Sequence, residues 1–186
     1  MRIIIDPGHG GRDPGAVDPI QTVENDQLNT VEAELNCEIG CRVKSYLESE
    51  GIVALLTRKP GEFVSLDDRA ELANRLKADG FVSIHLNAAA NPQAHGFEVF
   101  SHPGSRQGAR LRDAVLREVA ARFPAWTNRG AKTANFAVLR ETFCPACLIE
   151  CGFITHPDEE TRLSDPAVRD GLARGIAAGV IKFVAT

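Results

Sequence analysis

The chain has 186 residues, of which 44% are hydrophobic and 25% are charged, and its formal net charge is −4. These proportions are those of an ordinary globular protein, so they exclude a disordered or fibrous chain and favour one domain over residues 1–186. An acidic chain without runs of Lys or Arg also argues against a nucleic-acid partner. No apolar stretch reaches the roughly 18 residues that a membrane span requires, so we expect no membrane span.

Apolar and polar residues follow a pattern that predicts strands and helices in turn. In chain order, the predicted elements are a strand at 2–5, a helix at 31–49, a strand at 52–57, a helix that begins after the N-cap Ser65, strands at 80–86 and 96–101, a helix at 105–123, strands at 135–140 and 145–150, and a helix that begins after the N-cap Asp165. Such alternation is typical of an α/β fold. We therefore predict a single α/β domain with a six-stranded, mainly parallel sheet and helices on both faces.

Three residues with chemically useful side chains stand at the predicted C-terminal ends of strands. His9 follows the first strand in "IIIDPGHGG", His85 closes "FVSIH", and Glu150 closes "CPACLIE". Open α/β sheets place their chemistry beyond these ends of the strands. A carboxylate between two apolar residues is also costly to bury without a partner, which favours a functional role for Glu150. We expect the three side chains to meet at one edge of the sheet.

Two histidines and one carboxylate are the ligands of many catalytic zinc sites, which keep an open position for water. His9 and His85 supply the imidazoles, and the start of the first predicted helix offers Glu32 and Glu34. Helical periodicity places Glu32 on the apolar face that packs against the sheet, whereas Glu34 points about 200° away. We predict one catalytic Zn²⁺ bound by His9, Glu32 and His85, with Asn36 beside Glu32 on the same helical face.

The five cysteines do not form the even, spread pattern of a disulfide framework, so we expect reduced thiols. The segment "CPACLIEC" has two interpretations. Cys144, Cys147 and Cys151 have the spacing of a metal knuckle, but Cys147, Ile149 and Cys151 also alternate onto one face of a strand. We favour the second interpretation, in which the thiols act as small buried hydrophobes.

A series of motifs also runs along almost the whole chain in a fixed order. The motifs are "IIIDPGHGGRDPGA", Glu32-x3-Asn36, "LLTR", "SLDDRAELAN", "FVSIHLNA", "GFEVF", "RGAK", "FAVLR" and "LIECGFITHPDEE". In these motifs the chain resembles the zinc-dependent N-acetylmuramoyl-L-alanine amidases of the type 3 catalytic domain. The resemblance implies a hydrolase whose zinc ligands are the three residues chosen above and whose catalytic carboxylate is Glu150. It also implies a substrate, the amide bond between the lactyl group of N-acetylmuramic acid and L-alanine in peptidoglycan.

The chain departs from the family pattern at two positions. Ala33 stands where the family usually has Lys after the ligand glutamate, so Glu34 stays open as the alternative ligand, and His156 stands where the family usually has Asn. Two further polar residues are candidate substrate contacts. These are Asn87, just past the third strand, and Arg129, which we expect on a loop before the fifth strand and within reach of a stem-peptide carboxylate.

A cluster of charged residues follows the second predicted strand. We expect Arg58 and Arg69 to form a structural ion-pair cluster with Asp67 or Asp68 near the edge of the sheet.

Two other functions use the same features. The site would suit a zinc peptidase that cuts within the stem peptide, and the fold would suit a non-catalytic wall-binding protein, although such a protein has no need to keep all four site residues. We expect an enzyme, monomeric, that acts on peptidoglycan at the cell wall or in the periplasm. Because the N-terminal apolar run stops at Asp6, too early for a signal peptide, we expect either a phage endolysin that is cytoplasmic until release or a mature or trimmed bacterial autolysin.

Overall fold

The computed structural model describes residues 1–17 and 30–185, so part of the polar loop predicted before the first helix lies outside the described residues. The strands are β1 (Arg2–Pro7), β2 (Val53–Leu56), β3 (Gly80–Asn87), β4 (Phe97–Ser101), β5 (Asn128–Thr133) and β6 (Ala146–Phe153). The helices are α1 (Glu32–Ser49), α2 (Leu66–Arg75), α3 (Arg106–Arg122), α4 (Ala137–Arg140), α5 (Pro157–Leu163) and α6 (Pro166–Val184). None of the described helices is long and apolar enough to cross a membrane.

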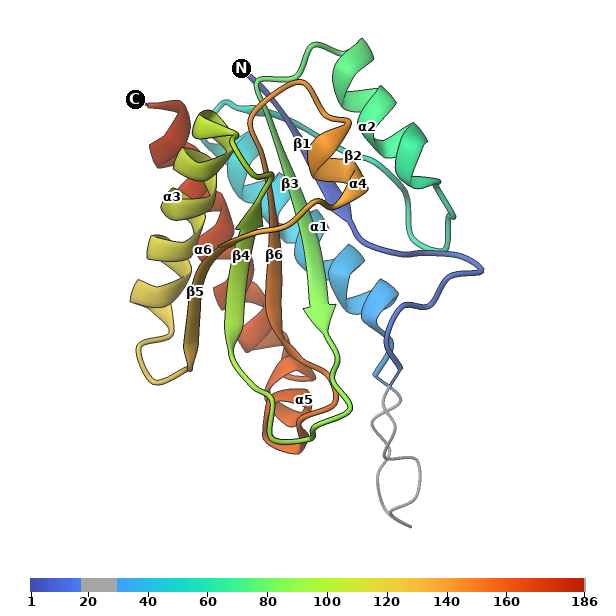
Figure 1. Cartoon of the computed structure of the whole chain (residues 1–186), viewed down its shortest axis with the longest axis vertical. Helices are drawn as coiled ribbons and strands as arrows, with labels where there is room; N and C mark the ends of the chain where they lie inside the picture. Colours follow the sequence, from blue (N-terminus) through green and yellow to red (C-terminus); the bar gives the residue numbers. More distant parts are fainter. Residues whose placement is uncertain (18–29, 186) are drawn as a thin grey trace.

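The strands form one sheet in the order β2-β1-β3-β6-β4-β5. Strands β2, β1, β3 and β6 are mutually parallel, whereas β4 pairs antiparallel with β6 and β5 pairs parallel with β4. This confirms the predicted α/β fold with a six-stranded, mainly parallel sheet (Figure 1). Because β4 and β5 run the other way, their N-terminal ends lie at the same edge as the C-terminal ends of β1, β3 and β6.

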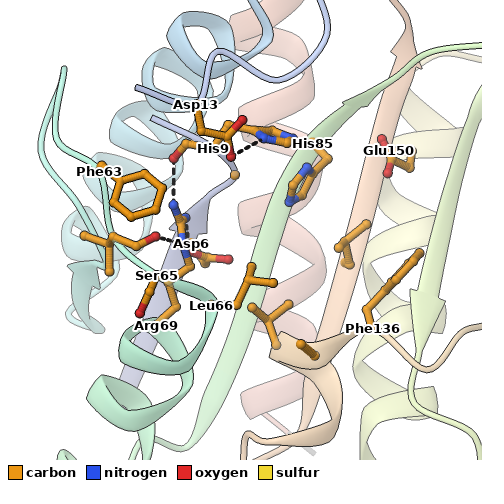
Figure 2. Close-up of a pocket in the computed structure, with 15 residues that line it drawn as sticks. Asp6, His9, Asp13, Phe63, Ser65, Leu66, Arg69, His85, Phe136 and Glu150 are labelled. Carbon is orange, nitrogen blue, oxygen red and sulfur yellow. Dashed lines mark hydrogen bonds and ion pairs between the residues drawn. The ribbon is translucent and has the colours of Figure 1, made fainter. Parts of the chain in front are cut away.

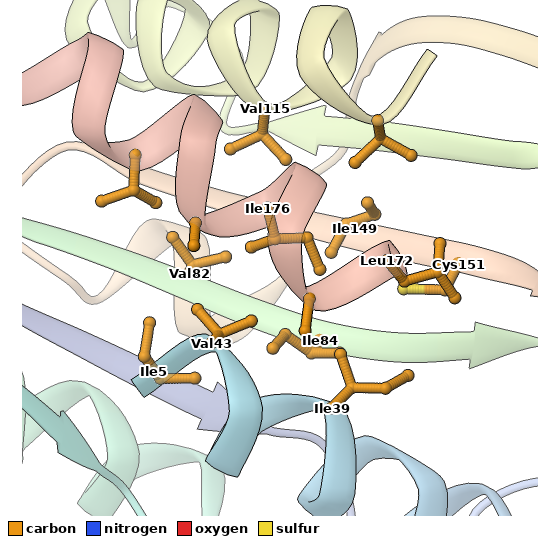
Figure 3. Packing of buried hydrophobic residues seen from close by; sticks show 14 of the residues in the cluster. Ile5, Ile39, Val43, Val82, Ile84, Val115, Ile149, Cys151, Leu172 and Ile176 are labelled. Carbon is orange, nitrogen blue, oxygen red and sulfur yellow. The ribbon is translucent and has the colours of Figure 1, made fainter. Parts of the chain in front are cut away.

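Helices cover both faces of the sheet, as predicted. On one face, Ile5, Ile84 and Ile149 of three neighbouring strands pack against α1, α3 and α6 and have no exposed surface (Figure 3). On the other face, a smaller apolar cluster packs under α2 and α4. Phe81 lies in this smaller cluster, and because side chains alternate along a strand, His85 points to the same face four residues later. One face of β3 is therefore apolar core at its start and polar site at its end.

The prediction of a fifth strand at residues 135–140 is wrong. Residues 137–140 form the short helix α4, and β5 lies earlier, at Asn128–Thr133, so Arg129 stands on a strand and not on a loop. An apolar run cannot be assigned to strand or buried helix by periodicity alone, and Val138 and Leu139 are buried as one helical turn against the sheet. Strand β5 is an edge strand without a fully buried residue, so it carries no apolar pattern by which to predict it.

The cysteines are free thiols, in agreement with the predicted reduced state. Cys147 and Cys151 lie beside Ile149 in the larger apolar cluster and have no exposed surface. Burial raises the pKa of both thiols, which keeps them protonated. In the described part of the chain, the cysteines at 144, 147 and 151 do not form a group that could hold a metal ion. The interpretation of these cysteines as small buried hydrophobes is therefore the one that the structure favours.

Candidate active site

The loop after β1 holds His9 in an unusual backbone conformation. His9 has φ +58°, in the left-handed region that few residues other than glycine adopt. A two-way backbone bridge stabilises the loop, since Gly10 N donates to Asp13 O at 2.7 Å and Asp13 N donates to Gly10 O at 3.1 Å. The bridge also brings Asp13 Oδ2 to 2.9 Å from His9 Nδ1. Asp13 therefore orients the imidazole, a role that our sequence analysis missed although this aspartate lies in the same motif.

Glu32, at the start of α1, lies between the two histidines. Its Oε2 is 3.3 Å from His9 Nε2 and its Oε1 is 3.0 Å from His85 Nδ1. Backbone N–H groups of Ala16 and Leu86 donate to the same carboxylate at 2.8 and 3.1 Å. Glu32 is only 3% exposed, so these contacts replace the water that its charge would otherwise hold.

The three side chains form the one group in the described chain that is arranged to hold a metal ion, with ligand atoms within 4.8 Å of one another. The rings of His9 and His85 lie 5.1 Å apart, centroid to centroid. Glu34 is exposed and points away, while Asn36 Nδ2 donates to Glu32 Oε1 at 3.2 Å. The structure thus brings together the predicted set that includes Glu32 and leaves Glu34 outside it.

Charges within this cluster favour a cation. A hydrogen bond to Glu32 raises the pKa of His9 to about 9, despite the opposing effect of burial. Burial by itself would raise the pKa of Glu32, but hydrogen bonds from His85 and His9 outweigh it and hold that pKa well below its usual range. Glu32 is therefore ionised at neutral pH, and a positive charge beside it, whether a proton on His9 or a metal ion, is stabilised.

Glu150, near the middle of β6, stands opposite His85 in the register of β3 and β6. Figure 2 shows His85 between His9 and Glu150 at the edge of the sheet. Glu150 Oε2 is buried and has no hydrogen-bond partner among the described residues. Burial raises the pKa of Glu150 to about 7. The nearby charge of His85 lowers this pKa, but the negative charges of Glu32 and Glu98 oppose that effect. A carboxyl group with this pKa can both accept and donate a proton near neutral pH.

A cleft of about 430 Å³ opens over these residues. His9, His85 and Glu150 line its floor, and Phe63, Leu66 and Phe136 stand at its walls (Figure 2). The last three side chains are 40%, 57% and 38% exposed, which is unusual for large apolar residues. Apolar walls around a few convergent polar groups are typical of a binding site for a small ligand or a chain segment.

A buried ion pair supports the loop that carries His9. Arg69 Nη1 donates to Asp6 Oδ1 at 2.8 Å, and both side chains are at most 3% exposed. Arg69 also donates to the carbonyls of Pro7 and His9, each at 2.7 Å. The ion-pair prediction for this region was therefore wrong about the partner, because Asp6 lies 63 residues away in the sequence. Arg58 pairs with no aspartate in the described part of the chain and instead donates to the backbone carbonyls of residues 7, 8 and 33.

We predict that Arg69→Met lowers the free energy of unfolding by about 3–5 kcal/mol, because it leaves the Asp6 carboxylate buried without its cation. Denaturation with urea, followed by circular dichroism, measures the change. Arg140→Met is the matched control, because Arg140 is exposed and pairs with Glu141 at the surface; it is expected to cost less than about 1 kcal/mol. Equal losses in the two variants would contradict the supporting role of the Asp6–Arg69 pair.

The two predicted substrate contacts lie together, beside Glu150 but outside the metal-ligand cluster. Asn87 Nδ2 donates to Glu98 Oε1 at 2.9 Å, and Arg129 Nε donates to Glu98 Oε2 at 2.9 Å. Glu98 is 4% exposed. Sequence reasoning did not identify Glu98 or its second cation, Lys132, although both belong to motifs named above.

The fold and the site define a single α/β domain with a candidate metal centre at the edge of its sheet. Known proteins share the fold. The N-acetylmuramoyl-L-alanine amidase family model matches residues 3–182, and the chain belongs to this family, as its motifs indicated. A sporulation-specific N-acetylmuramoyl-L-alanine amidase of Bacillus subtilis is 36% identical over 182 residues, which cover 97% of this chain and 67% of that protein.

Two solved structures of amidases have the same fold over nearly their whole length. The N-acetylmuramoyl-L-alanine amidase AmiC2 of Nostoc punctiforme superposes with a TM-score of 0.91 at 34% identity, covering 100% of this chain and 98% of the other. An N-acetylmuramoyl-L-alanine amidase of Clostridium difficile 630 superposes with a TM-score of 0.91 at 36% identity, covering 100% and 97%.

Proposed function

We propose that this protein hydrolyses the amide bond between the lactyl group of N-acetylmuramic acid and L-alanine in peptidoglycan, with one zinc ion held by His9, Glu32 and His85. The observation that carries the proposal is the position of Glu150, a carboxylic acid in the same cleft as two members of the cluster, with one oxygen that has no hydrogen-bond partner among the described residues. The family and the names of its members supply the identity of the bond. Since the substrate is a cell-wall polymer, the proposed site of action is the cell wall.

The residues present fit a zinc ion in donor chemistry and in spacing. Two imidazole nitrogens and one carboxylate form a common catalytic zinc set. Two atoms bound tetrahedrally at about 2.1 Å from one ion lie roughly 3.4 Å apart. His85 Nδ1 is 3.0 Å from Oε1 of Glu32 and His9 Nε2 is 3.3 Å from its Oε2, and one ligand atom from each residue lies within 4.8 Å of the other two, so small side-chain shifts bring the set onto one ion. The carboxylate of Asp13 on the second nitrogen of His9 is the partner that metal-bound histidines usually have.

The remaining chemistry belongs to the side chains of the cleft. When bound, a zinc ion supplies a water of lowered pKa and polarises the scissile carbonyl. Glu150 accepts the proton of the attacking water and returns it to the nitrogen of L-alanine as the bond breaks, so the carboxylate is regenerated in each cycle. Phe63, Leu66 and Phe136 surround the scissile bond with apolar surface, which strengthens the electrostatic contacts inside the cleft.

Digestion of purified peptidoglycan is expected to stop when a chelator removes the metal and to resume when zinc is added. Because the proposed bond joins glycan to peptide, mass spectrometry should find stem peptides with a new L-alanine amino terminus and glycan with free lactyl carboxylates. Digestion that a chelator leaves unchanged would contradict the metal, and new ends within the stem peptide would make the protein a peptidase.

A further inference from the structure

A second charged group lies beside Glu150 at the same edge of the sheet. Glu98 of β4 is the antiparallel partner of Glu150 of β6. Residues directly opposite each other in an antiparallel pair have Cα atoms about 4.5–5.5 Å apart and side chains on the same face. Glu98 therefore faces the same side of the sheet as His85 and Glu150, one strand further from the metal-ligand cluster.

Two cations hold this glutamate. Arg129 Nε and Lys132 Nζ both donate to Glu98 Oε2, and Asn87 occupies the other oxygen. Burial by itself would raise the pKa of Glu98, but Lys132 and Arg129 lower it below its usual value, so Glu98 is ionised. One carboxylate and two cations leave one excess positive charge next to the cleft.

The two cations keep donors for a further anion. Lys132 uses one of the three N–H bonds of its ammonium group on Glu98, and Arg129 Nη2 has no acceptor among the described residues. The side chains of Arg129 and Lys132 are 33% and 37% exposed. The Arg129 guanidinium stacks over the ring of Phe153 at 4.9 Å, which fixes its orientation.

The order of strands gives the substrate a direction. Across the sheet, His9 follows β1, β3 carries His85, and β6 carries Glu150. Further along, β4 carries Glu98 and β5 carries both cations. In the proposed reaction the scissile carbonyl lies at the metal-ligand cluster and the leaving nitrogen lies at Glu150, so the peptide continues toward β4 and β5. The acyl side of the bond then faces Phe63 and Leu66, on the opposite side of the cleft in Figure 2.

Distances along the peptide agree with this direction. Neighbouring strands lie about 4.8 Å apart, so β5 is roughly 10 Å from β6, and the side chain of Lys132 reaches back from β5 to Glu98. Two extended residues span up to about 7 Å. The second residue of a stem peptide, when it is D-isoglutamate, carries a free α-carboxylate, which this direction places next to the cations.

We propose that Lys132 and Arg129, held by Glu98, form a subsite for the carboxylate of the stem-peptide residue that follows L-alanine. The inference rests on the proposed amidase function, since it takes the position of the scissile bond from it. Glu98 is a positioning residue in this arrangement, and Lys132 and Arg129 bind the substrate. The subsite makes the enzyme select for a stem peptide whose second residue keeps its negative charge.

The test compares two substrates and one conservative pair of variants. The substrates are N-acetylmuramoyl-L-alanyl-D-isoglutamyl-L-lysine, in which the α-carboxylate of the second residue is free, and N-acetylmuramoyl-L-alanyl-D-isoglutaminyl-L-lysine, in which an amide replaces that carboxylate. In both substrates the γ-carboxyl group of the second residue is bound in the peptide bond to lysine. Lys132→Gln should raise KM about tenfold for the first substrate and less than twofold for the second, with kcat nearly unchanged, because only the first loses a charge-assisted hydrogen bond. Lys132→Arg should restore the KM. Glu98 stays paired with Arg129 in both variants, so both are expected to fold.

Lys182→Gln is the matched control, since it removes the same charge from an exposed lysine that pairs with Glu118 on α3, away from the cleft. Binding of the tripeptide L-alanyl-D-isoglutamyl-L-lysine, followed by NMR, gives a readout without turnover and should also weaken about tenfold in Lys132→Gln. Equal effects on both substrates, or none on either, would overturn the subsite while leaving the amidase intact. Cleavage of neither substrate by the unmodified enzyme, together with no digestion of peptidoglycan, would overturn the proposed function and the subsite with it.

Discussion

Glu150→Gln is expected to retain zinc and to lose about 10²–10⁴-fold in kcat, the usual contribution of a positioned acid–base group. Glutamine has the same shape and still fits on β6 opposite His85, but its amide cannot take a proton from water or deliver one to the departing nitrogen. Because Glu150 is not part of the His9–Glu32–His85 cluster, metal analysis of the purified variant should give the same zinc content as the unmodified protein. Release of L-alanine amino termini from peptidoglycan measures the loss of turnover.

Glu34→Gln is the matched control for this variant. It makes the same chemical change on a glutamate that is exposed and lies outside the cluster, so both zinc content and turnover should stay within about twofold of the unmodified protein. Near-normal turnover in Glu150→Gln would remove Glu150 from the catalytic role. Loss of zinc in the same variant would show that this carboxylate is a ligand, which the arrangement of the cluster does not suggest.

The residues at the site that sequence reasoning found share a simple property. His9, His85 and Glu150 follow or lie near the ends of the strands predicted from the sequence, and the rule that α/β sheets work at the C-terminal ends of their strands brings them together without knowledge of the strand order. In the structure β6 continues to Phe153, so Glu150 lies within the strand. Glu32 follows from helical periodicity, because the face of α1 that packs on the sheet is fixed by its apolar residues.

Apart from Asp13, whose partner His9 is only four residues away, the contacts that sequence reasoning missed depend on which elements are neighbours. Asp6 and Arg69 are 63 residues apart and meet only because α2 lies against the end of β1. Glu98 faces Glu150 because β4 runs antiparallel to β6, and Lys132 reaches it because β5 adds to the edge of the sheet. Hydrophobic patterns indicate which face of an element is buried, but they do not indicate which elements lie next to it. A polar edge strand such as β5 carries almost no hydrophobic pattern at all.

Gly8→Ala is expected to weaken zinc binding strongly although Gly8 carries no ligand atom. A Cβ at this position would lie 2.1 Å from His85 Cε1 and 2.6 Å from Nδ1, well inside van der Waals contact. Gly8 is not among the residues with positive φ, so alanine introduces no backbone strain, and Gly8 N still donates to Ile84 O at 2.9 Å. The imidazole must therefore turn away from Glu32, and we expect zinc affinity and peptidoglycan turnover to fall by about 10²-fold or more.

A double-mutant cycle with His85→Ala separates this steric effect from a general loss of folding. Each single variant should lose zinc, measured by metal analysis after dialysis, and the double variant should lose no more. In metal-free protein, Gly8→Ala alone should cost about 1–3 kcal/mol in the free energy of unfolding because it overpacks the site. In the His85→Ala background the same change should cost nearly nothing, because the ring that the new methyl group meets is gone. An equal cost in both backgrounds would mean that Gly8 is required for the loop itself and not for the approach of the histidine ring.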